Sequence, residues 1–238
     1  MSRITPIFNS FYTVAKPYNQ MASQFVRTDK YASEVNKKTK LSTIASPIKA
    51  ALEELETVEF SEKDIKYLKS LGVEINFNSG KDAIDFINKQ NLKIKFYNLE
   101  DKSIFAQFDG KNTIRINETY KNTGNRAEIL AISEAILHEA GHAKHNKSLN
   151  SIQDEMNNLA LNVLAHRFYL KKFPYIFDTS NSKIVQDGVN VYADLFFDPD
   201  PNKLALIKRL REKYGALPAG SKNNQPSIIA QRVKDCNA

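Results

Sequence analysis

The chain has 238 residues, of which 42% are hydrophobic and 26% are charged, and its formal net charge is +7. This length can bury one main core with smaller extensions, and no apolar run approaches the roughly eighteen residues that a membrane-spanning helix needs. We therefore expect one cytoplasmic domain with no membrane contact. The only cysteine, Cys236, excludes an internal disulfide and a thiolate metal cluster, which fits a reducing compartment.

The first part of the chain, residues 1–42, mixes Ser, Asn, Thr and Lys without sustained periodicity, and we expect an irregular basic arm or linker. A basic chain can favour acidic partners, nucleic acid among them. The lysines are scattered, however, and their densest run, at 37–40, is typical of a solvated linker. We therefore expect no nucleic-acid partner, and a basic nucleic-acid-associated protein is kept only as an alternative.

Two short helices are predicted to open the folded part, over residues 47–58 and 61–72. Pro47 suits the first turn of a helix, and the second helix begins with a capping-like sequence. Alternating apolar and polar residues then predict a strand at 73–77, and apolar residues at helical spacing predict a helix at 81–89.

A small sheet with a hairpin is predicted next. Residues 92–96 alternate as a strand does, and strands at 104–108 and 113–117 flank Asp109-Gly110, a pair that favours turns with a positive φ. The strand at 113–117 is short and one-sided, which is typical of an edge strand. An extended peptide could pair with such a strand through its backbone.

The rest of the chain is predicted to be mainly helical, with helices at 125–146, 152–172, 182–197 and 202–214. The break after residue 146 is short enough for the first two to pack as antiparallel neighbours, and residues 216–238 are expected to form a loose tail. The sequence thus predicts an α+β fold. A small mixed or antiparallel sheet packs on the helix at 125–146, within a domain spanning 43–215 whose core is 92–172.

The helix at 125–146 carries His138-Glu139-Ala140-Gly141-His142. An α-helix turns by about 100° per residue, so the two histidines lie one turn apart on one face, where both imidazoles can bind a single zinc ion. Zinc lowers the pKa of a bound water, and Glu139 can take the released proton and later deliver it to a leaving amine. These are the roles that peptide-bond hydrolysis requires.

Chance occurrence of the motif in an amphipathic helix is the alternative explanation. Three of the four histidines fall within eight residues, whereas surface histidines placed at random would be dispersed. Gly141 inside a helix costs about 1 kcal/mol relative to alanine. We therefore expect another element to approach the helix closely at this glycine.

A catalytic zinc has three protein ligands and one open position, so a third ligand is needed. Asp154 and Glu155 open the next helix, where an antiparallel return would bring a carboxylate near the metal. Residue 155 borders apolar positions while 154 is expected to point further outwards, so Glu155 is the expected ligand and Asp154 the alternative. His145 lies about 10 Å along the helix axis from His138, too far for all three histidines to bind one ion.

These residues resemble the ImmA/IrrE-like metallopeptidases. The resemblance covers about 92–170: the strand at 113–117, the helix with the HExxH motif, and an acid-led helix containing Glu155 and Ala160. It implies a zincin-like fold in which His138, His142 and Glu155 bind zinc and Glu139 is the general base.

The resemblance also implies where substrate binds. The strand with Ile114, Ile116 and Asn117 would hold the substrate backbone, and the substrates would be regulatory proteins or other peptides. A catalytically inactive zincin-fold interaction module is the alternative function, against which the intact Glu139 argues.

The donor that stabilises the developing oxyanion has four candidates. Each carries a ring N–H or a hydroxyl; they are Tyr120, His145, His166 and Tyr169. For His166 a solvent-exposed or packing role is expected in preference to catalysis.

Overall fold

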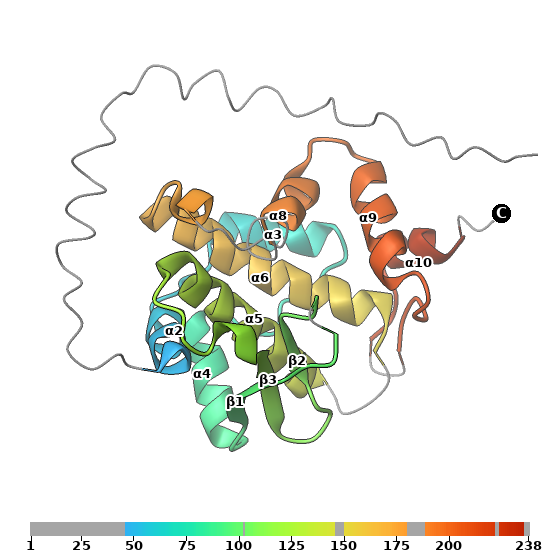
Figure 1. Ribbon diagram of the computed structural model, residues 1–238. Helices are drawn as coiled ribbons and strands as arrows, with labels where there is room; N and C mark the ends of the chain where they lie inside the picture. The colour runs from blue at the N-terminus through green and yellow to red at the C-terminus, as the bar shows by residue number, and fades with distance from the viewer. Residues whose placement is uncertain (1–45, 102, 146–149, 180–188, 222–223, 236–238) are drawn as a thin grey trace, which may run out of the picture. The chain divides into compact units, whose positions relative to one another are not determined.

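The fold has two long antiparallel helices at its centre, a small sheet beside one of them, and shorter helices around both (Figure 1). A computed structural model describes residues 46–101, 103–145, 150–179, 189–221 and 224–235. The predicted arm at 1–42 and Cys236 lie outside these residues. Within the described ranges, no helix combines the length and the apolar character needed to cross a bilayer.

The central helices are α5 (Arg126–His145) and α6 (Ile152–Lys172), and both match their predicted ranges closely. A capping box starts α6: the Ser151 hydroxyl accepts a hydrogen bond from the Asp154 N–H, and the Asp154 carboxylate accepts one from the Ser151 N–H, both 3.1 Å long. This reciprocal pair satisfies two backbone donors that the helix itself leaves free.

The two helices lie close together at Gly141. A Cβ atom at this position would lie 2.1 Å from Oδ1 of Asn158 on α6, so any other residue would force the Asn158 side chain to shift. The predicted reason for a glycine in the helix is therefore confirmed. Every α6 residue from 152 to 166 is buried, because α5, α8, α9, α10 and α3 all pack against this helix.

The sheet contains β1 (Lys93–Tyr97), β2 (Ala106–Phe108) and β3 (Thr113–Asn117) in the order β1-β3-β2. β1 runs parallel to β3, and β2 runs antiparallel to it. The predicted hairpin is confirmed, with Gly110 at a φ of +74° in the turn. The sheet packs on α5 through β2 and β3, so the predicted α+β class with a small mixed sheet is also confirmed.

The prediction that 113–117 forms an edge strand is wrong. β3 is the central strand, and its residues pair with β1 on one side and with β2 on the other. Ile114, Ile116 and Asn117 are buried, so they cannot offer a free edge to a substrate backbone. Alternation in the sequence shows that a segment is a strand, but the identity of its neighbours is set by the tertiary fold. β2 and β1 are the edge strands of this sheet.

Among the residues described from 46 onwards, three helices precede the sheet: α2 (Pro47–Glu56), α3 (Glu62–Ser70) and α4 (Gly80–Lys89). The predicted strand at 73–77 is wrong, since the segment forms no ladder. The Glu74 N–H instead donates to the side-chain oxygen of Asn157 on α6, at 3.0 Å. Val73 and Phe77 are buried, and the ring of Phe77 contacts Phe86 of α4. In the described part of the chain the segment pairs with no strand.

The short helices η3 (Glu118–Tyr120) and η4 (Ile176–Thr179) follow β3 and α6, and α8 (Val189–Phe197), α9 (Leu204–Tyr214) and α10 (Ile228–Asp235) complete the fold. The predicted helix at 182–197 is described only from residue 189.

The segment after residue 215 is not the loose tail that the sequence suggests. The N–H groups of Ile152 and Gln153 donate to the carbonyls of Pro218 and Ala219, at 2.9 and 3.1 Å. Asn224 is buried and donates to the Asp154 carboxylate at 2.8 Å. The free N-terminal donors of α6 therefore recruit this polar segment, which is part of the domain.

Candidate metal centre

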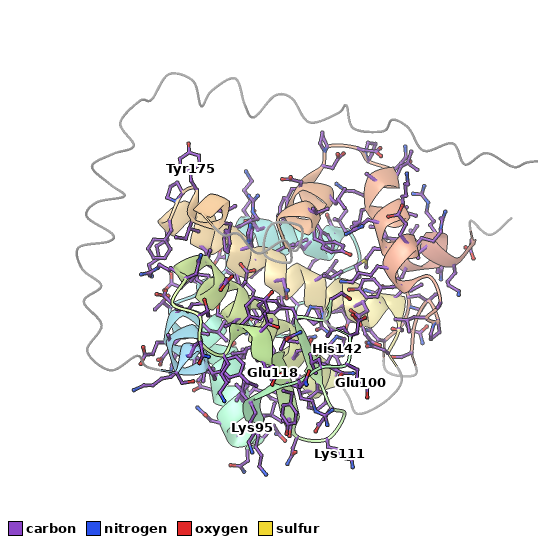
Figure 2. The ribbon with its side chains drawn as sticks, viewed as in Figure 1. Lys95, Glu100, Lys111, Glu118, His142 and Tyr175 are labelled. Carbon is purple, nitrogen blue, oxygen red and sulfur yellow. The ribbon has the colours of Figure 1, made fainter. Side chains whose placement is uncertain are left out.

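Two histidines from α5 and one glutamate from α6 converge on one point. The Nε2 atoms of His138 and His142 lie 3.1 Å apart. Glu155 places Oε2 3.6 Å from Nε2 of His138 and Oε1 3.5 Å from Nε2 of His142. The three side chains could hold a metal ion. Figure 2 labels His142, which lies on the side of the helices that faces the sheet.

The spacing of these donor atoms suits a tetrahedral zinc ion. Bonds of about 2.0–2.1 Å place neighbouring ligand atoms of a tetrahedron about 3.3–3.4 Å apart. The observed separations of 3.1, 3.5 and 3.6 Å bracket that value. Two imidazoles and one carboxylate are also a ligand set that leaves the fourth position open in catalytic zinc sites.

The electrostatics of Glu155 and His142 favour the protonation states that bind metal. Burial by itself would raise the pKa of Glu155, but its hydrogen bond with His138 and the charges of both histidines outweigh burial and hold the pKa at about 2. Burial lowers the pKa of His142, and His138 lowers it further. An ionised carboxylate and neutral imidazoles are the forms in which these groups coordinate a metal.

Asp154, the alternative third ligand, faces away from the histidines. The two residues are almost equally buried, at 8% exposed for Asp154 and 6% for Glu155, so exposure does not distinguish them. The two side chains point in different directions. Asp154 bonds to Ser151 and Asn224. Glu155 bonds to Asn150 and faces both histidines.

Glu139 lies beside the three ligands and is not one of them. Its Oε2 atom accepts a hydrogen bond of 2.7 Å from the backbone N–H of Phe108 in β2. Burial raises the pKa of Glu139 to about 7, against the opposing effect of His142. The sequence contained no signal for the contact with Phe108, which is 31 residues away.

A cavity of about 650 Å³ opens beside the metal ligands. Its walls come from α5, α6, α8, α9 and the stretch of chain that includes β2. The volume lies within the range of about 300–1,000 Å³ that is usual for ligand-binding clefts. His138, Glu139, His142 and Glu155 all line it, so the centre is open to a ligand.

Three residues of the C-terminal helices line the same cavity and were missed by sequence reasoning: Tyr192, Lys213 and Tyr214. Desolvation at the cavity wall lowers the pKa of Lys213, although Glu155 and Glu139 both act to raise it. Burial and the neighbouring Glu155 raise the pKa of Tyr214. These residues lie far along the chain from the HExxH motif, so no local sequence pattern connects them with it.

None of the four oxyanion candidates from the sequence is among the residues that line the cavity. Tyr120 packs its ring against Phe105, Tyr169 is hydrogen-bonded to Ser133 in the core, and His145 is the last residue of α5. His166 is buried, as a packing role requires, and bonds to a carboxylate.

Comparison with known proteins found no match to this chain among protein-family models, curated proteins or solved structures. We therefore infer the function from the residues of the site.

Proposed function

We propose that the protein is a zinc-dependent endopeptidase with a zincin-like arrangement of its HExxH helix and sheet, acting on protein or peptide substrates in the cytoplasm. One observation carries the proposal. His138, His142 and Glu155 converge at metal-binding distances in an open cavity, with the carboxylate of Glu139 beside them. A purely structural metal site would need neither the opening nor the additional acid.

The chain's own residues divide the work of hydrolysis. Zinc bound by His138, His142 and Glu155 would supply a Lewis acid and lower the pKa of water. Glu139 would accept a proton from the attacking water and return it to the leaving amine. The Phe108 N–H holds Oε2 of Glu139, which fixes the orientation of the carboxylate.

β2 can take the role of binding the substrate backbone, which the family resemblance implied for the strand at 113–117. Hydrogen bonds at Asp109–Thr113 and Phe105–Asn117 point the alternate backbone groups of β2 towards β3. By the alternation of an antiparallel ladder, the backbone groups of Ala106 and Phe108 face the free edge. The Phe108 N–H is used by Glu139, and the groups of Ala106 can pair with an extended substrate.

Lys213 and Tyr214 are the proposed donors to the developing oxyanion. Both line the cavity, and both interact electrostatically with Glu155. A donor at this wall can stabilise negative charge that appears on the substrate carbonyl next to the metal.

The test combines metal content with cleavage. Wild-type protein purified without added metal is expected to hold about one zinc per chain. Glu139→Gln should keep the metal and lose about 100-fold or more of the cleavage rate on an unfolded protein substrate. His142→Ala and Glu155→Ala should lose metal and activity together.

His145→Ala is the matched control, because it removes a histidine from the same helix outside the cavity. It should keep both metal and activity. Wild-type protein that takes up no zinc on titration would contradict the proposal and favour the interaction-module alternative. Full activity in Glu139→Gln would remove the general base from the mechanism.

A further inference from the structure

Glu134 is a buried carboxylic acid in the cavity wall that the proposed chemistry does not use. Glu134 lines the cavity and is 2% exposed. It lies one helical turn before His138 on the same face of α5, about 6 Å along the axis. The cavity therefore runs along α5 from the metal ligands to a buried acid.

Among the described residues, one basic side chain lies at ion-pair distance from Glu134, and it is that of a histidine. The Oε1 atom of Glu134 lies 2.9 Å from Nδ1 of His166, whose ring stacks on Phe177 at 4.4 Å between centroids. Within the ranges that the structure describes, no lysine or arginine lies at ion-pair distance from Glu134. Lys213, the cation at the cavity wall, acts on Glu155 and Glu139 instead.

Asn162 is another polar residue in the wall of the cavity. Asn162 is 8% exposed and lines the cavity, and among the described residues nothing donates to its Oδ1 atom. The antiparallel register of α5 and α6 brings Glu134 opposite His166. It therefore brings Asn162, one turn earlier on α6, opposite the turn between Glu134 and His138. Leaving a buried acceptor without a donor is costly, and a donor that reaches Asn162 from this end of the cavity would remove that cost.

We propose that this end of the cavity binds the basic side chain of a substrate residue next to the scissile bond, arginine or lysine. The proposal rests on the peptidase function. Glu134 pairs with the cation, and Asn162 Oδ1 accepts one of its N–H groups. Ala131 and Phe177, which also line the cavity, cover the aliphatic stem. An extended lysine side chain reaches about 6 Å, which matches the distance from the metal ligands.

Other ligand classes fit the site less well. An acidic side chain would meet the charge of Glu134. An apolar one would leave the Asn162 Oδ1 atom without a donor and would give the Glu134 carboxylate no partner beyond His166. A guanidinium group offers five N–H donors in a planar fork and suits a carboxylate and an amide oxygen together.

Binding of small probes tests the inference directly. The full-length Glu139→Gln protein, loaded with zinc, is titrated with N-acetyl-arginine amide, N-acetyl-lysine amide and N-acetyl-citrulline amide, and binding is followed by NMR or calorimetry. Citrulline has nearly the shape of arginine without the charge. The arginine amide is expected to bind about tenfold more tightly than the citrulline amide, as one buried charge-assisted contact allows. The lysine amide shows whether an ammonium group is accepted as well.

Glu134→Gln, which keeps an acceptor for His166, should remove the preference for arginine while metal content stays unchanged. Asp101→Asn removes a carboxylate at the cavity mouth and should keep the preference within about twofold, since exposed charges contribute little. Asn162→Leu is the second variant, which removes an acceptor without changing charge, and it should weaken arginine binding. Equal binding of arginine and citrulline, or equal loss in Asp101→Asn and Glu134→Gln, would overturn the inference.

Cleavage of a mixed peptide library separates this inference from the proposed function. Cleavage with arginine or lysine enriched at one position, and without that enrichment in Glu134→Gln, supports both. Cleavage with no such enrichment keeps the peptidase function and overturns the basic-residue site. Arginine binding that requires Glu134, in a protein that cleaves nothing, supports the site and contradicts the peptidase function.

Discussion

Gly141→Ala should destabilise the protein, although alanine is the better helix former. The substitution gains about 1 kcal/mol of helix propensity. The new Cβ atom would lie 2.1 Å from Oδ1 and 2.9 Å from Cγ of Asn158, which is 1% exposed. Overpacking of this kind costs about 1–3 kcal/mol, so a net loss of up to about 2 kcal/mol of unfolding free energy is expected. In a domain of this size that lowers Tm by up to about 8 °C.

The same substitution should weaken metal binding, because α5 carries two ligands and α6 carries the third. Metal sites tolerate changes in distance of only about 0.2 Å, so pushing the helices apart is expected to reduce zinc affinity about tenfold or more. Chemical denaturation of the metal-free protein measures the first effect, and a competitive zinc titration measures the second.

A double-mutant cycle with Asn158→Ala isolates the clash. Neither side-chain polar atom of Asn158 has a hydrogen-bond partner in the described part of the chain, so this variant breaks no bond that would confuse the cycle. With Asn158 shortened, Gly141→Ala should become neutral or stabilising by up to about 1 kcal/mol. An equal cost in both backgrounds, or a stabilised single variant, would refute the packing argument.

Three further predictions concern stability. Ser133→Ala should cost about 1–3 kcal/mol by chemical denaturation, and more than Tyr169→Phe, because it leaves the buried Tyr169 hydroxyl without its 2.7 Å partner; a larger cost for Tyr169→Phe would contradict this. Asp109 is partly desolvated, but backbone N–H bonds from the turn and a nearby arginine hold its pKa below 3.8. The stability that its carboxylate contributes is therefore present above that pH and is lost as pH falls through the lowered pKa. The stability difference between wild type and Asp109→Asn should therefore be constant near neutrality and shrink below about pH 4; a pH-independent difference would show that the charge is not involved. Deleting residues 216–238 should lower Tm and expose the start of α6, whose N–H groups bond to that segment; unchanged hydrogen exchange there would contradict its structural role.

The sequence by itself determined the local features. Helical periodicity defined α5 and α6, and Asp109-Gly110 defined the hairpin, because these signals act between residues close in the chain. The candidate metal ligands were also within reach of sequence reasoning. The spacing of His138 and His142 is a property of one helix, and the short connection to α6 limits where Glu155 can lie.

Only the tertiary structure decided which surfaces meet. Strand order made β3 central and β2 the edge, which moved the expected substrate contact from Ile114 and Ile116 to Ala106. Packing of α9 brought Lys213 to the cavity, and the antiparallel register of α5 and α6 placed Glu134 opposite His166. These contacts join residues far apart in the chain. Periodicity shows that a side chain is buried, but the partner that buries it depends on how the helices and strands pack together.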